Sequence, residues 1–187
     1  LAVGGGSANE PRMVVLSYRP PSATAHIAFV GKGITVDSGG LSLKPKNDMQ
    51  GMKGDMAGAA AVAAAVRAIA QLGLPIEVTG FAAIAENMPG GSAMRPGDVL
   101  AYRNGKTVEI LDTDEEGRLV LADALILAAE RDPELIVDLA TLTGASSISL
   151  GRGTAAIFSN SPEHEALIHE VSDAVGEAMW PLPILDG

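Results

Sequence analysis

Two short stretches of the sequence concentrate residues that could carry chemistry. The first is G-K-G-I-T-V-D-S-G-G, residues 31–40, in which Lys32 and Asp37 flank a short apolar strand. Lys44 follows in a loop, and Asp55 precedes an Ala-rich segment that is typical of a helix. Because open α/β sheets place their sites at strand ends, these charged side chains are candidates for a common site.

The second stretch is L-D-T-D-E-E-G-R-L, residues 111–119. Asp114, Glu116 and Arg118 alternate in it, so an extended backbone would point all three side chains the same way. Two carboxylates beside a guanidinium are costly to assemble unless something binds them. Oxygen donors of this kind suit Mg, Mn or Zn. The sequence therefore predicts a carboxylate-rich metal site.

Each cluster taken alone also has an ordinary interpretation. A single D-x-E-x-R is commonly a solvated turn or a helix-cap arrangement. Asp55 could cap the Ala-rich helix, where the helix dipole favours a negative charge. Lys32, which stands between two glycines, could be a surface lysine in a turn. The prediction of a metal site therefore depends on the joint pattern.

Taken jointly, these segments resemble the leucyl aminopeptidase (cytosol aminopeptidase) family. The resemblance is carried by G-K-G-I-T-V-D-S-G-G-L-S-L-K-P, M-K-G-D-M-A-G-A-A and T-D-E-E-G-R-L-V-L-A-D-A-L. Shorter matching stretches are A-E-N-M-P, R-P-G-D-V, N-G-K-T-V-E-I and D-L-A-T-L-T-G-A. They occur in order from Leu1 to about Leu182, so the resemblance covers nearly the whole chain.

The resemblance implies two divalent metal ions and five protein ligands. The ligands of the tightly bound ion would be Lys32, Asp37, Asp55 and Glu116. Those of the exchangeable ion would be Asp37, Asp114 and Glu116, so that Asp37 and Glu116 bridge the pair. Mn or Zn is expected, with Mg or Co as further candidates at the exchangeable position.

Further roles are implied outside the metal ligands. Lys44 matches the catalytic lysine of the family, and Arg118 matches a catalytic arginine that holds a bicarbonate ion, the expected general base. Met52, Thr141 and Gly144 match positions that line the substrate pocket, although Met52 alone fits an ordinary core position equally well.

These residue types suit the implied chemistry. Two ions about 3.5–4 Å apart can share a hydroxide that attacks a peptide carbonyl, and one of them can take the free α-amine of the substrate. A protonated Lys44 can stabilise the developing oxyanion. Lys32 must be neutral to donate a lone pair, and burial beside divalent ions would lower its pKa by roughly 3–5 units. The two lysines are therefore expected to differ in protonation.

Three positions depart from the family pattern. Asp112 stands where Asn is typical, Glu115 where Ala is typical, and Gly5 where Gln is typical. None of them replaces an implied ligand, but the first two add negative charge beside the site.

Other kinds of active site find little support. The three histidines, at positions 26, 164 and 169, lack H-E-x-x-H spacing, which argues against a zincin. Ser38 lacks the G-x-S-x-G elbow, and the glycine-rich stretches lack a phosphate-binding loop.

The elements that must position these residues alternate between strands and helices. Strands are expected at residues 13–18, 27–30, 34–36, 76–85, 136–139 and 155–158. Helices are expected at residues 55–72, 118–131 and 162–179. Asn104-Gly105 predicts a hairpin between strands at 99–102 and 107–111. The fold class is therefore α/β, with a mixed sheet flanked by helices on both faces, of the zinc-exopeptidase type by resemblance.

Composition restricts the partners and the location. The 187 residues carry a net charge of −10 and no basic block, which disfavours nucleic acid and anionic membranes. The chain contains no cysteine, which is compatible with a cytoplasmic location. By resemblance, residues 1–187 are expected to be part of a C-terminal catalytic domain, cut at both ends and lacking an N-terminal domain, in a homohexamer.

The favoured hypothesis is a metal-dependent aminopeptidase that releases Leu and similar residues from peptides with a free N-terminus. One alternative is a catalytically silent homologue kept as a structural or binding subunit, which loss of a ligand would favour. Another is a different metalloenzyme, such as a phosphatase, which would not require a free α-amine.

Overall fold

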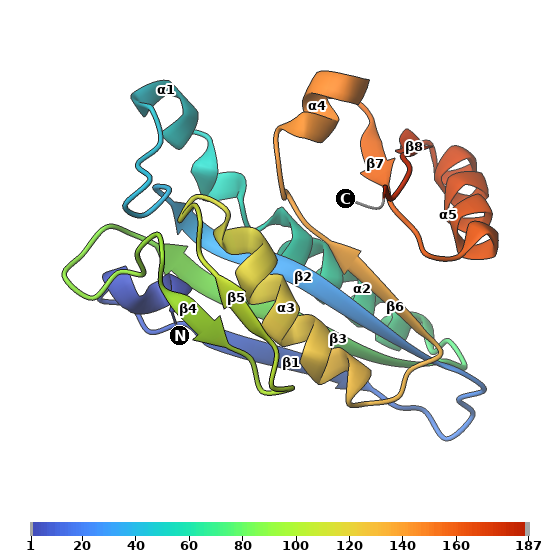
Figure 1. Cartoon of the computed structure of the whole chain (residues 1–187). Helices are drawn as coiled ribbons and strands as arrows, with labels where there is room; N and C mark the ends of the chain where they lie inside the picture. Colours follow the sequence, from blue (N-terminus) through green and yellow to red (C-terminus); the bar gives the residue numbers. More distant parts are fainter. Residues whose placement is uncertain (1, 186–187) are drawn as a thin grey trace. The chain divides into compact units, whose positions relative to one another are not determined.

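The computed structural model describes residues 2–185 (Figure 1). They divide into two compact units, with the boundary between Leu142 and Thr143. The first unit contains a four-stranded sheet in the order β1-β3-β2-β6. Its strands are β1 (Arg12–Tyr18), β2 (His26–Asp37), β3 (Glu77–Asn87) and β6 (Leu135–Leu139). β1 runs antiparallel to β3, whereas β2 is parallel to both β3 and β6. The predicted mixed sheet is thus confirmed.

One face of this sheet is covered by helix α2 (Ala57–Leu72), and the opposite face by α3 (Glu116–Ala129) (Figure 1). Side chains alternate across β2, so Ile27 and Phe29 pack toward α2 whereas Ala28 and Val30 pack toward α3. Helices therefore flank both faces, as predicted.

Helix α2 forms because its sequence is rich in alanine, the best helix former. It ends at Gly73, which adopts the left-handed conformation (φ +65°) that glycine tolerates. Only one side is buried, through Gly58, Ala59, Val62 and Val66. The stretch Lys46–Leu72 has the length and apolar composition of a membrane span, yet α2 packs on the sheet and η2 interrupts the stretch.

The remaining elements of the first unit are short. They are η1 (Val3–Gly6), α1 (Lys46–Met49), η2 (Met52–Gly54) and the hairpin strands β4 (Val99–Ala101) and β5 (Thr107–Glu109). The hairpin is antiparallel and turns through Asn104-Gly105, where Gly105 has a φ of +82°. The hairpin prediction is therefore confirmed, with slightly shorter strands.

The second unit contains α4 (Ala145–Leu150), β7 (Ala155–Ile157), α5 (Pro162–Val175) and β8 (Met179–Pro181). β7 and β8 pair in parallel. Helix α5 begins after Ser161, whose hydroxyl accepts a hydrogen bond from the His164 N–H, with Pro162 at its first position. It ends before Gly176, so the expected extension to residue 179 was wrong, because a left-handed glycine stops the helix.

The strand signals at 27–30 and 34–36, of which the second continues the first after Gly33, belong to one continuous strand, β2. The glycines between them serve close packing, because a Cβ at Gly31 would lie 2.6 Å from Ala59 Cα. Gly58 of α2 is tighter still, since a Cβ there would lie 2.0 Å from the Leu139 carbonyl oxygen of β6. The N-terminal turn of α2 can therefore approach the sheet only through small residues.

We expect Gly58→Ala to destabilise the protein by about 1–3 kcal/mol or more through overpacking, although alanine is the better helix former. The clash should win because the opposing atom is a backbone carbonyl held in a β-ladder. Gly91→Ala is the matched control, since a Cβ there meets no described atom within 4 Å. Urea midpoints that shift equally in both variants would contradict this account.

Candidate metal centre

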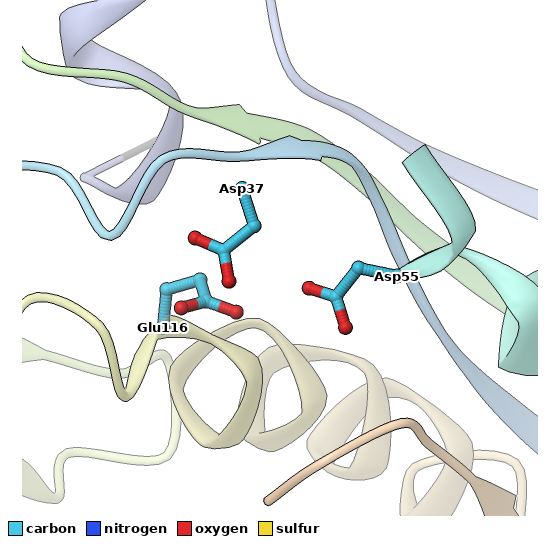
Figure 2. A group of neighbouring side chains, drawn as sticks. All are labelled: Asp37, Asp55 and Glu116. Atoms are coloured by element: carbon cyan, nitrogen blue, oxygen red, sulfur yellow. The ribbon is translucent and has the colours of Figure 1, made fainter. Parts of the chain in front are cut away.

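Three buried carboxylates converge beyond the end of the sheet (Figure 2). They belong to Asp37, Asp55 and Glu116, which are 2%, 5% and 0% exposed. Each offers an oxygen that lies within 4.8 Å of the others, close enough to share a metal ion. Three largely unexposed acids at this separation are unfavourable unless positive charge is nearby.

Each carboxylate comes from the end of a different element. Asp37 is the last residue of β2, Asp55 follows η2 and precedes α2, and Glu116 is the first residue of α3. The site therefore lies at the carboxyl ends of the parallel strands, where open α/β sheets place their ligands.

Lys32 supplies one of two positive charges in this cluster. Its side chain is 3% exposed, and its Nζ lies 2.8 Å from Asp55 Oδ2 and 2.9 Å from Glu116 Oε1. The same Nζ donates a hydrogen bond of 3.1 Å to the Thr141 carbonyl oxygen. Gly117 makes room for it, because a Cβ there would lie 2.7 Å from Lys32 Cε. Lys32 is thus enclosed on all described sides.

Lys44 supplies the second charge at the outer side of the cluster. Its Nζ lies 3.2 Å from Asp37 Oδ2 and 2.6 Å from Asp114 Oδ1. The Lys44 side chain is 14% exposed and that of Asp114 is 32% exposed. This end of the cluster is therefore accessible to solvent, unlike the end at Lys32.

The loop between Asp37 and Lys44 is fastened to Thr113, which is fully buried. The Thr113 hydroxyl donates to the Gly39 carbonyl oxygen at 2.6 Å and accepts from the Ser42 N–H at 2.8 Å. Gly39 takes a positive φ of +85° that allows the turn. The loop conformation that places Lys44 therefore depends on the stretch that also carries Asp114.

The donor set fits divalent cations. Three buried oxygens, Asp55 Oδ2, Asp114 Oδ1 and Glu116 Oε1, form no hydrogen bond of regular geometry with the described residues, although each lies within 2.9 Å of a lysine Nζ. Four carboxylates against two ammonium groups leave an excess of negative charge when all are ionised. Buried carboxylates with spare lone pairs are the ligands that Mn, Mg and Zn use.

Burial dominates the electrostatics of the acids. It raises the pKa of the Asp55 and Asp114 carboxyls above their ordinary values, although Lys32 and Lys44 respectively act against the shift. Burial likewise raises the pKa of the Glu116 carboxyl to about 7, against the attraction of Lys32. Protons therefore compete with any cation for this site.

The pKa values of the two lysines are also raised, which favours their charged form. Burial opposes the charge on Lys32, but the attraction of Glu116 and the hydrogen bonds to Asp55 and Glu116 prevail, so its pKa lies above the ordinary value. The pKa of Lys44 is raised in the same way, by Asp114 and Asp37 against the effect of burial. With a raised pKa, Lys32 is charged in the protein without metal, so it could become neutral only beside bound cations. Its neutral form as a metal ligand therefore stays a prediction.

The Arg118 side chain does not point to the same side as that of Glu116. The expectation that Asp114, Glu116 and Arg118 point the same way was therefore wrong for Arg118. Helix α3 begins at Glu116, two residues earlier than predicted, and helical residues two apart point away from one another. Glu116 is consequently buried, whereas the Arg118 side chain is 56% exposed and pairs with Glu115. The chain brings together the five predicted metal ligands and Lys44, with Arg118 on the outside.

The predicted substrate-binding residues lie in three different places. Met52 is half-buried in η2. Thr141 is exposed, and its hydroxyl donates a hydrogen bond of 2.7 Å to Asp55 Oδ1. Gly144 belongs to the second unit and precedes α4. Their contact with substrate stays a prediction.

Of the positions that depart from the family pattern, Asp112 contacts a metal-ligand segment. Its Oδ1 accepts a hydrogen bond of 2.9 Å from the Asp114 N–H, and this contact, with one from Ser42, lowers the pKa of the Asp112 carboxyl. The negative charge expected beside the site is therefore retained.

Two buried residues of the centre had no role predicted from the sequence. They are Asn87, at the end of β3, and Thr113. Asn87 could have been noticed in the sequence as a polar residue at the end of an apolar strand, within the stretch A-E-N-M-P.

A mixed β-sheet flanked by helices, with buried acids and a lysine at the ends of its parallel strands, defines this unit as an α/β domain with a candidate metal centre. The sequence profile described as "Cytosol aminopeptidase family, catalytic domain" matches residues 1–187. The chain therefore belongs to the cytosol aminopeptidase family, which confirms the resemblance.

Individual relatives agree with this assignment. The chain is 58% identical over 184 residues to a probable cytosol aminopeptidase of Streptomyces coelicolor (strain ATCC BAA-471 / A3(2) / M145), covering 98% of the chain and 36% of that protein. A probable cytosol aminopeptidase of Leifsonia xyli subsp. xyli (strain CTCB07) is 57% identical, with 98% and 37% covered. The chain thus spans about a third of the length of these relatives.

A solved structure is also similar. The bottromycin maturation enzyme BotP in complex with Mn superimposes with a TM-score of 0.93 at 49% identity. The match covers 98% of this chain and 41% of that one. The similarity supports the α/β architecture described above.

The pKa of Glu116 predicts how stability depends on pH in EDTA-treated protein. Between its ordinary pKa of 4.5 and about 7, only the folded state retains the proton, so this stabilisation is lost as the pH rises through about 7. The full shift corresponds to about 3 kcal/mol. We expect the thermal midpoint to fall between pH 5 and 8, and to fall less steeply in Glu116→Gln. An equally steep fall in the variant would show that another group is responsible.

Proposed function

We propose that this chain forms part of the catalytic domain of a two-metal aminopeptidase, with an N-terminal domain and further catalytic-domain residues outside residues 1–187. The observation that carries the proposal is the convergence of Asp37, Asp55 and Glu116, all buried, of which Asp55 and Glu116 each keep an oxygen without a regular hydrogen bond to the described residues. Such an arrangement is unfavourable without cations and becomes favourable with them.

Two groups of residues would hold the ions. Lys32, Asp37, Asp55 and Glu116 would bind the first, and Asp37, Asp114 and Glu116 the second. The Mn named for the similar BotP structure supports Mn as one occupant, with Zn, Mg or Co as alternatives. When bound, two divalent ions supply Lewis acidity, which makes a nucleophile available from water at neutral pH.

Lys44 is suited to stabilise the oxyanion that develops on the scissile carbonyl. Its ammonium lies between Asp37 and Asp114, which raise its pKa in the metal-free site, and its side chain is partly exposed. A preorganised donor of this kind is most effective in a site that excludes much of the water. Lys32, enclosed by Asp55 and Glu116, has no comparable access.

The acidic rim favours a substrate with a free N-terminus. Asp114 is the most exposed of the four carboxylates, and Asp112 adds a further negative charge beside it. An α-amino group complements this charge better than the interior of a peptide does.

The outer residues would complete the site. Arg118 would hold a bicarbonate ion, and the bicarbonate would act as the general base. Glu115 pairs with the same guanidinium and would compete with the bicarbonate for it. Met52, Thr141 and Gly144 would contact the substrate, with Leu and similar side chains preferred. A cytoplasmic homohexamer is proposed for the assembly.

The proposal predicts metal-dependent release of p-nitroaniline from Leu-p-nitroanilide by the full-length protein. Activity should be lost after EDTA treatment and return when Mn or Zn is restored. N-acetyl-Leu-p-nitroanilide, which lacks a free amine, is the matched control and should not be cleaved. Folded protein without activity in any metal would refute the aminopeptidase, and metal-dependent cleavage of p-nitrophenyl phosphate instead would indicate a phosphatase.

Lys44→Ala should lower kcat by about 10²–10³-fold, as expected for removal of an oxyanion donor. Metal content per chain should not fall, because the substitution removes a positive charge that lies beside two ligands. The exposed Lys106 of the hairpin turn provides the control variant Lys106→Ala. Loss of metal in Lys44→Ala, measured by atomic absorption, would mean that the two lysine roles are misassigned.

A further inference from the structure

Asn87 contacts two acids of the carboxylate cluster, Asp37 and Glu116, although it cannot itself carry charge. It is the last residue of β3 and the register partner of Asp37 in β2. Its side chain is almost fully buried, at 1% exposed. A buried amide at a strand end requires partners for its donors.

The partners are residues that belong to the metal centre. Asn87 Nδ2 donates to Asp37 Oδ1 at 2.9 Å, and it lies 3.3 Å from Glu116 Oε2. Nδ2 also donates to the Thr113 carbonyl oxygen at 2.9 Å, so its two N–H groups serve three acceptors and the longer contact to Glu116 shares a hydrogen. One amide thus connects β2, the stretch before α3, and the first residue of α3.

The division of carboxylate oxygens follows from these contacts. Asp37 Oδ1 accepts from Asn87 and from the Gly39 N–H, whereas Asp37 Oδ2 faces Lys44. Glu116 Oε2 faces Asn87, whereas Glu116 Oε1 faces Lys32 and has no regular hydrogen bond to the described residues. In both acids one oxygen is held by the protein and the other is left toward the cluster.

We propose that Asn87 is a positioning residue that orients Asp37 and Glu116 so that one oxygen of each remains available to a cation. The inference rests on the proposed metal site and adds to it a residue outside the ligand set. Partners of metal ligands that fix their orientation typically change metal affinity or activity by about 10–100-fold when removed.

An amide suits this position better than a charged donor. A lysine or arginine would add a third positive charge and offset the negative charge that attracts cations, whereas an aspartate would donate nothing. Space is also limited, because a Cβ at Gly40 would lie 2.9 Å from Asn87 Oδ1. The backbone of Asn87 contributes too, since its carbonyl oxygen accepts from the Ser38 N–H at 3.0 Å and the Ser38 hydroxyl at 2.7 Å.

The test compares the Mn²⁺ affinity of the full-length wild-type protein with that of the Asn87→Ala variant by equilibrium dialysis. Both proteins are first treated with EDTA and then shown to be folded. We expect the affinity of the variant to fall about 10–100-fold. Thr79→Val is the matched control, because Thr79 is also buried on β3 and its hydroxyl hydrogen-bonds His26 Nε2 away from the centre. Its Mn²⁺ affinity should stay within about twofold of the wild type, even where its thermal midpoint falls.

Three results would overturn the inference in distinguishable ways. Asn87→Ala with wild-type Mn²⁺ affinity but a lower thermal midpoint would reduce Asn87 to a fold-stabilising residue. If Asn87→Ala does not fold, Asn87→Ser replaces it, since its shorter side chain cannot reach both acids, and unchanged affinity there has the same meaning. A wild-type protein that binds no Mn²⁺ would refute the proposed metal site itself.

Discussion

The gathering of four carboxylates, three of them buried, beside two lysines is the constraint on which the rest of this structure depends. An isolated buried carboxylate would be expelled or protonated, so the acids persist only where positive charge lies within contact distance. Lys32 and Lys44 divide this task, with Lys32 pairing Asp55 and Glu116 and Lys44 pairing Asp37 and Asp114. The excess negative charge that remains suits the centre to the cations proposed for it.

The glycines around β2 follow from this constraint. Lys32 lies on the strand face covered by α3, and the absence of a side chain at Gly117 leaves room for it there. On the other face, Gly58 of α2 meets the backbone of β6 and of Lys32. Both helices therefore approach the strand through residues without a side chain, which brings Asp55 and Glu116 within reach of one ammonium group.

The sequence predicted those features that depend on local chemistry. Gly73 ends α2 and Asn104-Gly105 turns the hairpin because their backbone preferences act within a few residues. The start of α3 was predicted too late, since the acidic stretch before it resembles an extended turn. This error alone placed Arg118 on the side of Glu116 and not opposite it.

The sequence predicted which charged residues lie together at the candidate site, but not the uncharged residues that contact them. The charged residues were selected through the resemblance, since no single cluster distinguished a metal site from a solvated turn, and their role as ligands stays a prediction. Asn87 meets Asp37 from 50 positions away and Glu116 from 29 positions away, and such contacts leave no trace in spacing along the chain. Only the register of β2 against β3 brings Asn87 and Asp37 side by side.

The two lysines show how position, and not residue type, divides the proposed roles. Among the protein's own groups, the pKa of each is raised by neighbouring acids, so their intrinsic acidity does not separate a metal ligand from a proton-bearing catalytic group. Access does separate them. Among the described residues, Lys32 is enclosed by Asp55, Glu116 and the Thr141 carbonyl, so it could bind a cation inside the cluster after losing its proton but could not reach a substrate outside it. The partly exposed Lys44 can still reach a peptide. The same burial that makes Lys32 a suitable ligand therefore prevents it from acting on substrate.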